Sequence, residues 1–152
     1  MAGDAGQTDG SYDYIMAGGG LAGLSLAYHI ERLASRPPRM LIIDPDRKEN
    51  DDRTWCFWTA QATPFDHVVY HVWHRAAWIS DRFQRVEDLA PYRCQMIRGA
   101  EFYPAAREAL AQTGRAAFVY GRVDEIQDSK NGAQVLAAGK AYLGNWVFDS
   151  LL

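Results

Sequence analysis

The segment from Tyr12 to Asp44 constrains the fold more than any other part of the chain. A β-prone run leads into a glycine loop with the spacing G-x-G-x-x-G, formed by Gly18, Gly19, Gly20, Leu21, Ala22 and Gly23. In such a loop the first glycine permits a tight turn, the second lets the backbone approach a pyrophosphate, and the third lets a helix lie close to a sheet. The phosphate would lie at a helix N-terminus, where unpaired N–H groups and the helix dipole favour negative charge.

The residues after the glycines predict a complete strand, helix and strand. Apolar residues recur at helical spacing from Leu21 to Ala34, and Pro37 and Pro38 end any helix. The run 39–43 is typical of a buried parallel strand, and it ends at Asp44, about twenty residues beyond the last glycine. An acid at this place accepts hydrogen bonds from an adenosine ribose. We therefore assign the glycine loop and Asp44 to a dinucleotide; the alternative is a glycine-rich turn in an unrelated βαβ unit.

Composition narrows the class of protein. The 152 residues are 48% hydrophobic and 23% charged, with a net charge of -3, which indicates a globular chain and gives no electrostatic case for nucleic acid. The two cysteines, Cys56 and Cys94, fit no zinc or redox pattern, and a reduced, cytoplasmic setting fits them best. No apolar run reaches the roughly 20 residues that span a bilayer, so we expect any membrane association to be peripheral.

The remaining segments predict an α/β chain: a Rossmann-like FAD-binding fold with the start of a β-rich substrate domain. We expect a flexible leader at 1–11, then the N-terminal part of a two-domain protein at 12–152, with its βαβ unit at 12–60. Within it we expect one or two short strands at 65–80, a strand at 92–97, a helix at 101–112, a strand at 117–126, an Asn-Gly hairpin turn at 128–132 and a last strand at 146–148. By the rule that ligands lie beyond strand carboxyl ends, Asp149 is a further candidate beside the cofactor. The abrupt end after this strand indicates a truncated chain.

Three histidines, at His67, His71 and His74, would align on a helix and could then bind a metal. The valines between them favour a strand instead, which places His74 on the opposite face from the other two. We therefore expect no metal site.

A second motif follows a highly charged loop: Arg53-Thr54-Trp55-Cys56-Phe57-Trp58. Three aromatic residues in four positions need burial against something. With this motif and the glycine loop together, the sequence resembles the bacterial lycopene beta-cyclases, which are FAD-dependent flavoproteins of carotenoid biosynthesis. The resemblance runs from about Tyr12 to Ser150, and its specific part is the run from Arg53 to Trp58.

The resemblance implies an isomerase that folds each linear ψ-end of lycopene into a β-ionone ring, by way of γ-carotene to β-carotene. Protonation of a terminal double bond, ring closure and loss of a proton leave no net redox change, yet the family needs reduced FAD, with NAD(P)H as the expected reductant. It also implies a cytoplasmic protein at the inner face of the membrane. The family's acidic Phe-x-Glu-Glu-Thr segment and its C-terminal Gly-Asp region do not occur in this sequence. The catalytic residues are thus unknown, and we expect no cyclisation by this chain alone.

The resemblance also suggests roles in the second motif. Arg53 is expected to meet the pyrophosphate or the flavin edge with its planar guanidinium, and a surface salt bridge is the alternative. Trp55, Phe57 and Trp58 are expected to line the polyene channel, and plain packing is the alternative. Two other functions remain open: a different FAD-dependent oxidoreductase such as a hydroxylase, and a non-catalytic dinucleotide-binding module.

Overall fold

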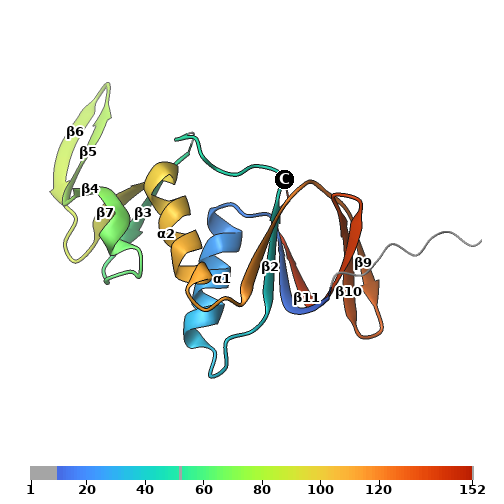
Figure 1. The fold of residues 1–152 in the computed structure, drawn as a ribbon. Coiled ribbons are helices and arrows are strands. Elements are labelled where there is room, and N and C mark those ends of the chain that lie inside the picture. The colour runs from blue at the N-terminus through green and yellow to red at the C-terminus, as the bar shows by residue number, and fades with distance from the viewer. Residues whose placement is uncertain (1–9, 52, 152) are drawn as a thin grey trace, which may run out of the picture. The chain divides into compact units, whose positions relative to one another are not determined.

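The structure, a computed structural model, describes residues 10–51 and 53–151 and divides into two units (Figure 1). Of the described residues, the first unit comprises 10–47 and 106–151, and the second comprises 48–51 and 53–105. The expected leader at 1–11 falls mostly outside the described residues, and Ser11 already belongs to the first strand. The structure divides the chain at Arg47 rather than at residue 60, so the motif around Trp55 belongs to the second unit.

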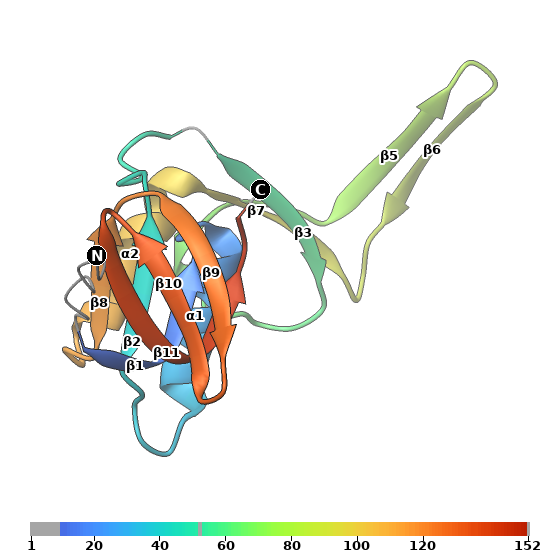
Figure 2. The same cartoon turned by 90° about the vertical axis from the view of Figure 1, so that its right-hand side faces the viewer.

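The first unit contains a six-stranded sheet with the order β8-β2-β1-β11-β10-β9. Four neighbouring strands, β8, β2, β1 and β11, run parallel, whereas β10 and β9 are antiparallel additions (Figure 2). The bounds are β1 Ser11–Ala17, β2 Met40–Asp44, β8 Ala116–Tyr120, β9 Val123–Ser129, β10 Gly132–Ala137 and β11 Lys140–Asp149. Helix α1 (Leu21–Leu33) connects β1 to β2. This is the Rossmann-like α/β architecture predicted from the sequence.

Burial explains why these elements form. Every residue of β2 is buried, as the continuous apolar run predicts for a parallel strand covered on both faces. Helix α1 buries Leu24 and Ala27 completely, and these two residues are three positions apart, which places them on one face of the helix. Because β1 and β2 are parallel and joined by α1, their carboxyl ends lie at the same edge of the sheet.

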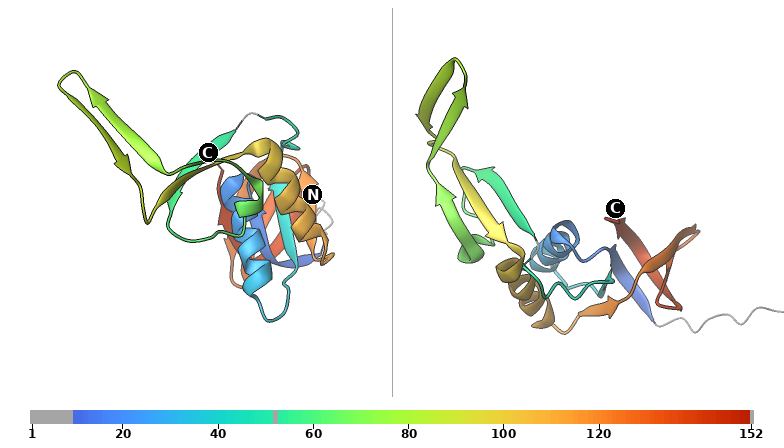
Figure 3. Two further views of the ribbon diagram at one scale, coloured as in Figure 1. Left: turned by 90° about the vertical axis from the view of Figure 1, so that its left-hand side faces the viewer. Right: turned by 90° about the horizontal axis from the view of Figure 1, so that it is seen from above.

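The second unit contains a three-stranded antiparallel sheet with the order β3-β7-β4 and a separate hairpin of β5 and β6 (Figure 3). The bounds are β3 Thr54–Thr59, the 3-10 turn η1 Asp66–Val68, β4 Val69–Trp73, β5 Arg75–Ser80, β6 Phe83–Asp88 and β7 Arg93–Arg98. Helix α2 (Gly99–Ala111) begins in this unit and ends in the first one.

One predicted strand is wrong. The run 117–126, expected as a single strand, forms β8 and β9, which break at Gly121. The parallel strand β8 ends where the N–H of Gly121 donates to the carbonyl oxygen of Asp44 at 3.1 Å, and Val123 then pairs with β10 instead. The Asn-Gly hairpin is confirmed: Ser129 pairs with Gly132, whose φ of +130° favours glycine.

Candidate functional site

The candidate site lies at the carboxyl edge of β1 and β2, where the glycine loop leaves the sheet. The N–H of Gly18 donates to the carbonyl oxygen of Ile43 at 2.9 Å and so continues the β1–β2 ladder by one residue. Gly18 has a φ of +114°, and a Cβ at this position would overlap the hydroxyl oxygen of Ser150. The first glycine is therefore required by the backbone turn itself.

The other two motif glycines differ in their surroundings. A Cβ at Gly23 would overlap the carbonyl oxygen of Gly18, which is the close approach of helix and strand expected from the sequence. A Cβ at Gly20 would meet nothing within 4 Å, and the φ of Gly20 is an ordinary -77°. Nothing among the described residues requires a glycine at position 20, whereas a pyrophosphate against this backbone would require one.

Helix α1 begins at Leu21, directly after its N-cap residue Gly20, and its N-terminus is open to an anion. No side chain of residues 10–51 or 53–151 caps it, and no acidic residue lies in its first turn. The first N–H groups of a helix, here those at Leu21 and Ala22, have no partner within the helix and carry its positive dipole end. The open space at Gly20 and the uncapped helix therefore fit the same negatively charged group.

Asp44 is the last residue of β2 and lies beside the glycine loop. Its side chain is 8% exposed, and each of its carboxylate oxygens accepts a backbone hydrogen bond at 2.8 Å: Oδ2 from Gly19 and Oδ1 from Asp46. The structure thus brings Asp44 against the glycine loop, as the sequence spacing predicts. The carboxylate is held at a fixed place beside the loop, and a carboxylate is suited to accept hydroxyl donors such as those of a ribose.

The chain after β11 contributes a contact that sequence reasoning missed. The N–H of Ser150 donates to the carbonyl oxygen of Ala17 at 2.8 Å, and its hydroxyl also reaches that oxygen, at 3.3 Å. Asp149 pairs with Ala17 across the parallel strands, so it lies at the same edge as the glycine loop, and its Oδ1 accepts the N–H of Leu151 at 2.8 Å. A serine after a strand carries no motif signal, so only the strand pairing could have indicated it.

The second motif lies in the second unit, where β3 divides its aromatic residues between two faces. Trp55 is half-buried in an edge-to-face cluster with Phe102 and Tyr103, at ring-centroid distances of 5.6 and 5.7 Å. Phe57 shares the face of Trp55, whereas Trp58 lies on the other face and is 56% exposed. The side chain of Arg53 is exposed, and its carbonyl oxygen accepts the N–H of Gly99 at 2.8 Å.

A charged network holds the loop before β4. The carboxylate of Asp66 accepts hydrogen bonds from the N–H and hydroxyl groups of Thr63, and an ion pair of 3.2 Å joins it to Arg93. The hydroxyl of Thr63, more than any other group, holds the pKa of Asp66 below its usual value.

The described residues contain neither a metal-binding cluster nor a membrane-spanning helix. Across 10–51 and 53–151, no group of three His, Cys, Asp or Glu side chains is placed to hold a metal ion. In the same part of the chain, no helix is long and apolar enough to cross a membrane.

Comparisons with known proteins give both the fold and the family. None of the curated proteins matches the sequence. PqsL from Pseudomonas aeruginosa, described as a probable FAD-dependent monooxygenase, has a TM-score of 0.70 and 16% identity over 91% of this chain and 42% of PqsL. The halogenase PltM, solved with phloroglucinol and FAD, has a TM-score of 0.64 and 13% identity over 92% of this chain and 34% of PltM. The chain therefore spans less than half the length of these structures. Residues 13–151 match the family described as lycopene cyclase protein, and the chain belongs to that family.

Proposed function

We propose that this chain is the cofactor-binding part of an FAD-dependent lycopene beta-cyclase, an enzyme that closes the ψ-ends of lycopene into β-ionone rings. The family match over residues 13–151 carries this proposal. The open backbone at Gly20 supports it, because the described residues leave room there for a ligand to approach the main chain.

The residues at the carboxyl edge of β1 and β2 fit the adenosine half of FAD. The pyrophosphate would lie against Gly20 and accept hydrogen bonds from the N–H groups at the start of α1. Gly18, Gly19 and Gly23 shape the loop, and Asp44 would accept the ribose hydroxyls from its fixed position. Bound reduced FAD would supply electron density close to a cationic substrate, and NAD(P)H would serve as its reductant.

The second unit is assigned to the apolar substrate. Of the three aromatic residues in the Arg53–Trp58 motif, Trp58 is best placed to meet a polyene, because it is 56% exposed. Trp55 and Phe57 would pack within the second unit and support β3 without meeting the substrate, because they lie on the more buried face of β3. Arg53 is retained as a contact for the pyrophosphate or the flavin edge. Lycopene is a membrane solute, so the complete enzyme would work at the inner bilayer surface.

Cofactor binding is tested by titrating FAD into the chain and following flavin fluorescence. Gly20→Val places a branched side chain in the space assigned to the pyrophosphate, and we expect at least a tenfold loss of affinity. Ala77→Val is the matched control, because Ala77 is exposed in the hairpin of the second unit. If Gly20→Val bound FAD as tightly as the parent chain, the assignment of the loop would be wrong.

Cyclisation is tested with the protein expressed from its complete reading frame, given lycopene and reduced FAD. Ring closure shifts chromatographic retention and leaves the mass of the product equal to that of lycopene. The structural likeness to PqsL makes a flavin hydroxylase the second candidate, and such an enzyme would add the mass of oxygen. Tight FAD binding with lycopene unchanged would instead favour the third candidate, a non-catalytic dinucleotide-binding module.

A further inference from the structure

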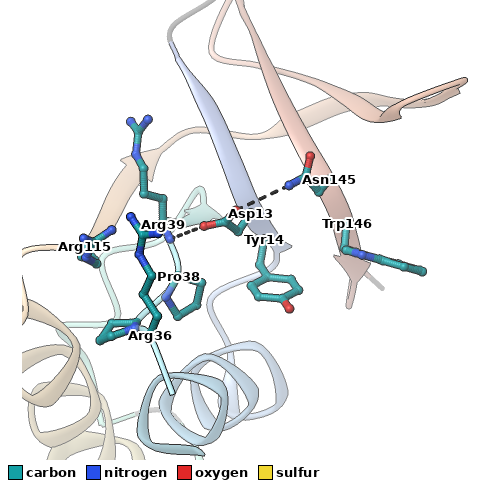
Figure 4. Close-up of a pocket in the computed structure, with 9 residues that line it drawn as sticks. Asp13, Tyr14, Arg36, Pro38, Arg39, Arg115, Asn145 and Trp146 are labelled. Carbon is teal, nitrogen blue, oxygen red and sulfur yellow. Dashed lines mark hydrogen bonds between the residues drawn. The ribbon is translucent and has the colours of Figure 1, made fainter. Parts of the chain in front are cut away.

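A pocket of about 510 Å³ lies in the first unit at the amino ends of the parallel strands, whereas the glycine loop lies at their carboxyl ends (Figure 4). Asp13 and Tyr14 line it near the start of β1, and Arg39 and Arg115 line it just before β2 and β8 begin. Tyr14 precedes Gly18 by four strand positions, which is roughly 13 Å at the rise of an extended chain. The pocket is therefore separate from the site assigned to FAD.

Three arginine side chains line one side of this pocket, those of Arg36, Arg39 and Arg115 (Figure 4). Among residues 10–51 and 53–151, none of the three forms an ion pair with a carboxylate. Like charges that gather without counter-ions repel one another, and a bound anion would remove that cost.

The one acidic residue in the lining does not neutralise them. Asp13 accepts the backbone N–H of Arg39 at 2.7 Å on Oδ2, and the side-chain amide of Asn145 reaches Oδ1 at 3.5 Å. Its carboxylate is thus directed at amides rather than at a guanidinium. Three arginines and one aspartate leave the lining with a net charge of 3 − 1 = +2.

The backbone that carries the arginines is fixed by the sheet. The carbonyl oxygen of Arg39 accepts the N–H of Asp13 at 2.8 Å, and that of Arg115 accepts the N–H of Met40 at 2.9 Å. Pro37 and Pro38 restrict the chain between Arg36 and Arg39. A fixed backbone reduces the conformational entropy that long side chains lose when they converge on a ligand.

A second pocket of about 430 Å³ adjoins the first and is also lined by Arg39 and Arg115. Guanidinium groups bind phosphate oxygens through paired N–H donors, and two adjoining hollows suit two neighbouring phosphate groups. We propose that Arg36, Arg39 and Arg115 form a binding site for a phosphate-bearing ligand, distinct from the cofactor site at the opposite edge of the sheet. The phosphate comes either from a soluble diphosphate compound or from a phospholipid headgroup.

The test is calorimetric titration of the whole chain with inorganic pyrophosphate. We expect saturable binding that weakens with salt, and Arg36→Gln or Arg115→Gln each to lower the affinity about tenfold. Arg82→Gln is the matched control, because it removes the same charge from the exposed tip of the hairpin. Retained circular dichroism shows that the variants fold. These titrations are made in the Gly20→Val background, which blocks the pyrophosphate position at the cofactor loop, so that the binding measured belongs to the arginine pocket.

The source of the phosphate is decided by sedimentation with phosphatidylcholine vesicles, with and without phosphatidic acid. Pyrophosphate binding without sedimentation assigns the pocket to a soluble ligand. Sedimentation only with phosphatidic acid, lost in Arg115→Gln, assigns it to a headgroup. If neither probe binds, or if Arg82→Gln weakens binding as much as Arg115→Gln does, the proposal is overturned.

Discussion

At the level of single residues, Gly20 and Gly23 lie in one loop yet are glycines for opposite reasons. The chain itself forbids a side chain at Gly23, where a Cβ would overlap the carbonyl oxygen of Gly18. Apart from Gly20 and its chain neighbours, no atom of the described residues lies within 4 Å of the Cβ that Gly20 lacks. Sequence spacing alone treats these two positions as equivalent members of one motif. The structure shows a folding requirement at Gly23, whereas the binding requirement at Gly20 is our proposal.

Alanine at each position should reveal this difference. We expect Gly23→Ala to lower the free energy of unfolding by about 2–3 kcal/mol, because the backbone of β1 and α1 must move apart. Gly20→Ala should change it by less than about 1 kcal/mol, because the new methyl group meets no atom. Urea unfolding followed by circular dichroism measures both. Equal losses of stability in the two variants would contradict the separation.

Ser150 shows what residue patterns leave out. Its N–H and hydroxyl groups both contact the carbonyl oxygen of Ala17, which is 133 positions earlier in the sequence. The spacing of Gly18 to Asp44 is local, so it could be read directly from the sequence. A contact between the ends of β1 and β11 requires knowledge of which strands are neighbours, and no residue type signals it.

At the level of elements, the loop before β4 depends on the ionised form of Asp66. The pKa of this carboxyl is lowered from 3.8, chiefly by the Thr63 hydroxyl, so the folded state binds its proton less readily than the unfolded state. The resulting stabilisation is present above pH 3.8 and is lost as the pH falls through the lower folded-state pKa.

Asp66→Asn tests this dependence. At pH 7 we expect a loss of roughly 0.5–1 kcal/mol, a small value because the side chain is partly exposed and solvent screens its charge. Below the folded-state pKa the variant and the parent chain should have the same urea midpoint. Asp81→Asn, at the exposed tip of the hairpin, should leave the midpoint unchanged at both pH values. A deficit that persisted in acid would assign the role of Asp66 to packing instead.

The hairpin of β5 and β6 pairs with no other described strand, and both of its strands are largely exposed. A two-stranded ribbon without further cover opens easily, so protease should reach it first. We expect limited trypsin digestion to begin at Arg82, which lies between the two strands. The products are identified by mass, and Arg82→Gln should slow the first cut. Initial cleavage at Arg39 would contradict this order.

Elements that depend on signals local in the sequence were predicted more accurately than elements that depend on contacts between distant segments. Strands β1 and β2 and helix α1 were predicted closely, because the continuous apolar run, the helical period and the prolines are local signals. The break at Gly121 was missed, since β8 ends through a hydrogen bond to Asp44 and β9 leaves to pair with β10. Strand β6 was also missed, because its exposed residues show no buried face.

At the level of the whole molecule, the division into two units separates the predicted cofactor residues. The glycine loop and Asp44 belong to the first unit, whereas Arg53 belongs to the second. A cofactor held by the first unit alone should stabilise only the elements that form its edge. A cofactor that also meets Arg53 should stabilise both units, because a ligand stabilises whatever must be folded to bind it.

Hydrogen exchange of backbone amides, with and without FAD, distinguishes these two cases. We expect slower exchange in residues 18–24 and 44–46, because opening that edge would release the ligand. The hairpin at 75–88 should exchange equally fast in both states and serves as the internal reference. Slower exchange at 53–58 would support the role proposed for Arg53, and Arg53→Gln should then abolish it. If the cofactor protected the glycine loop and left 53–58 unchanged, Arg53 would be a surface residue, and the flavin contacts would lie with other parts of the protein.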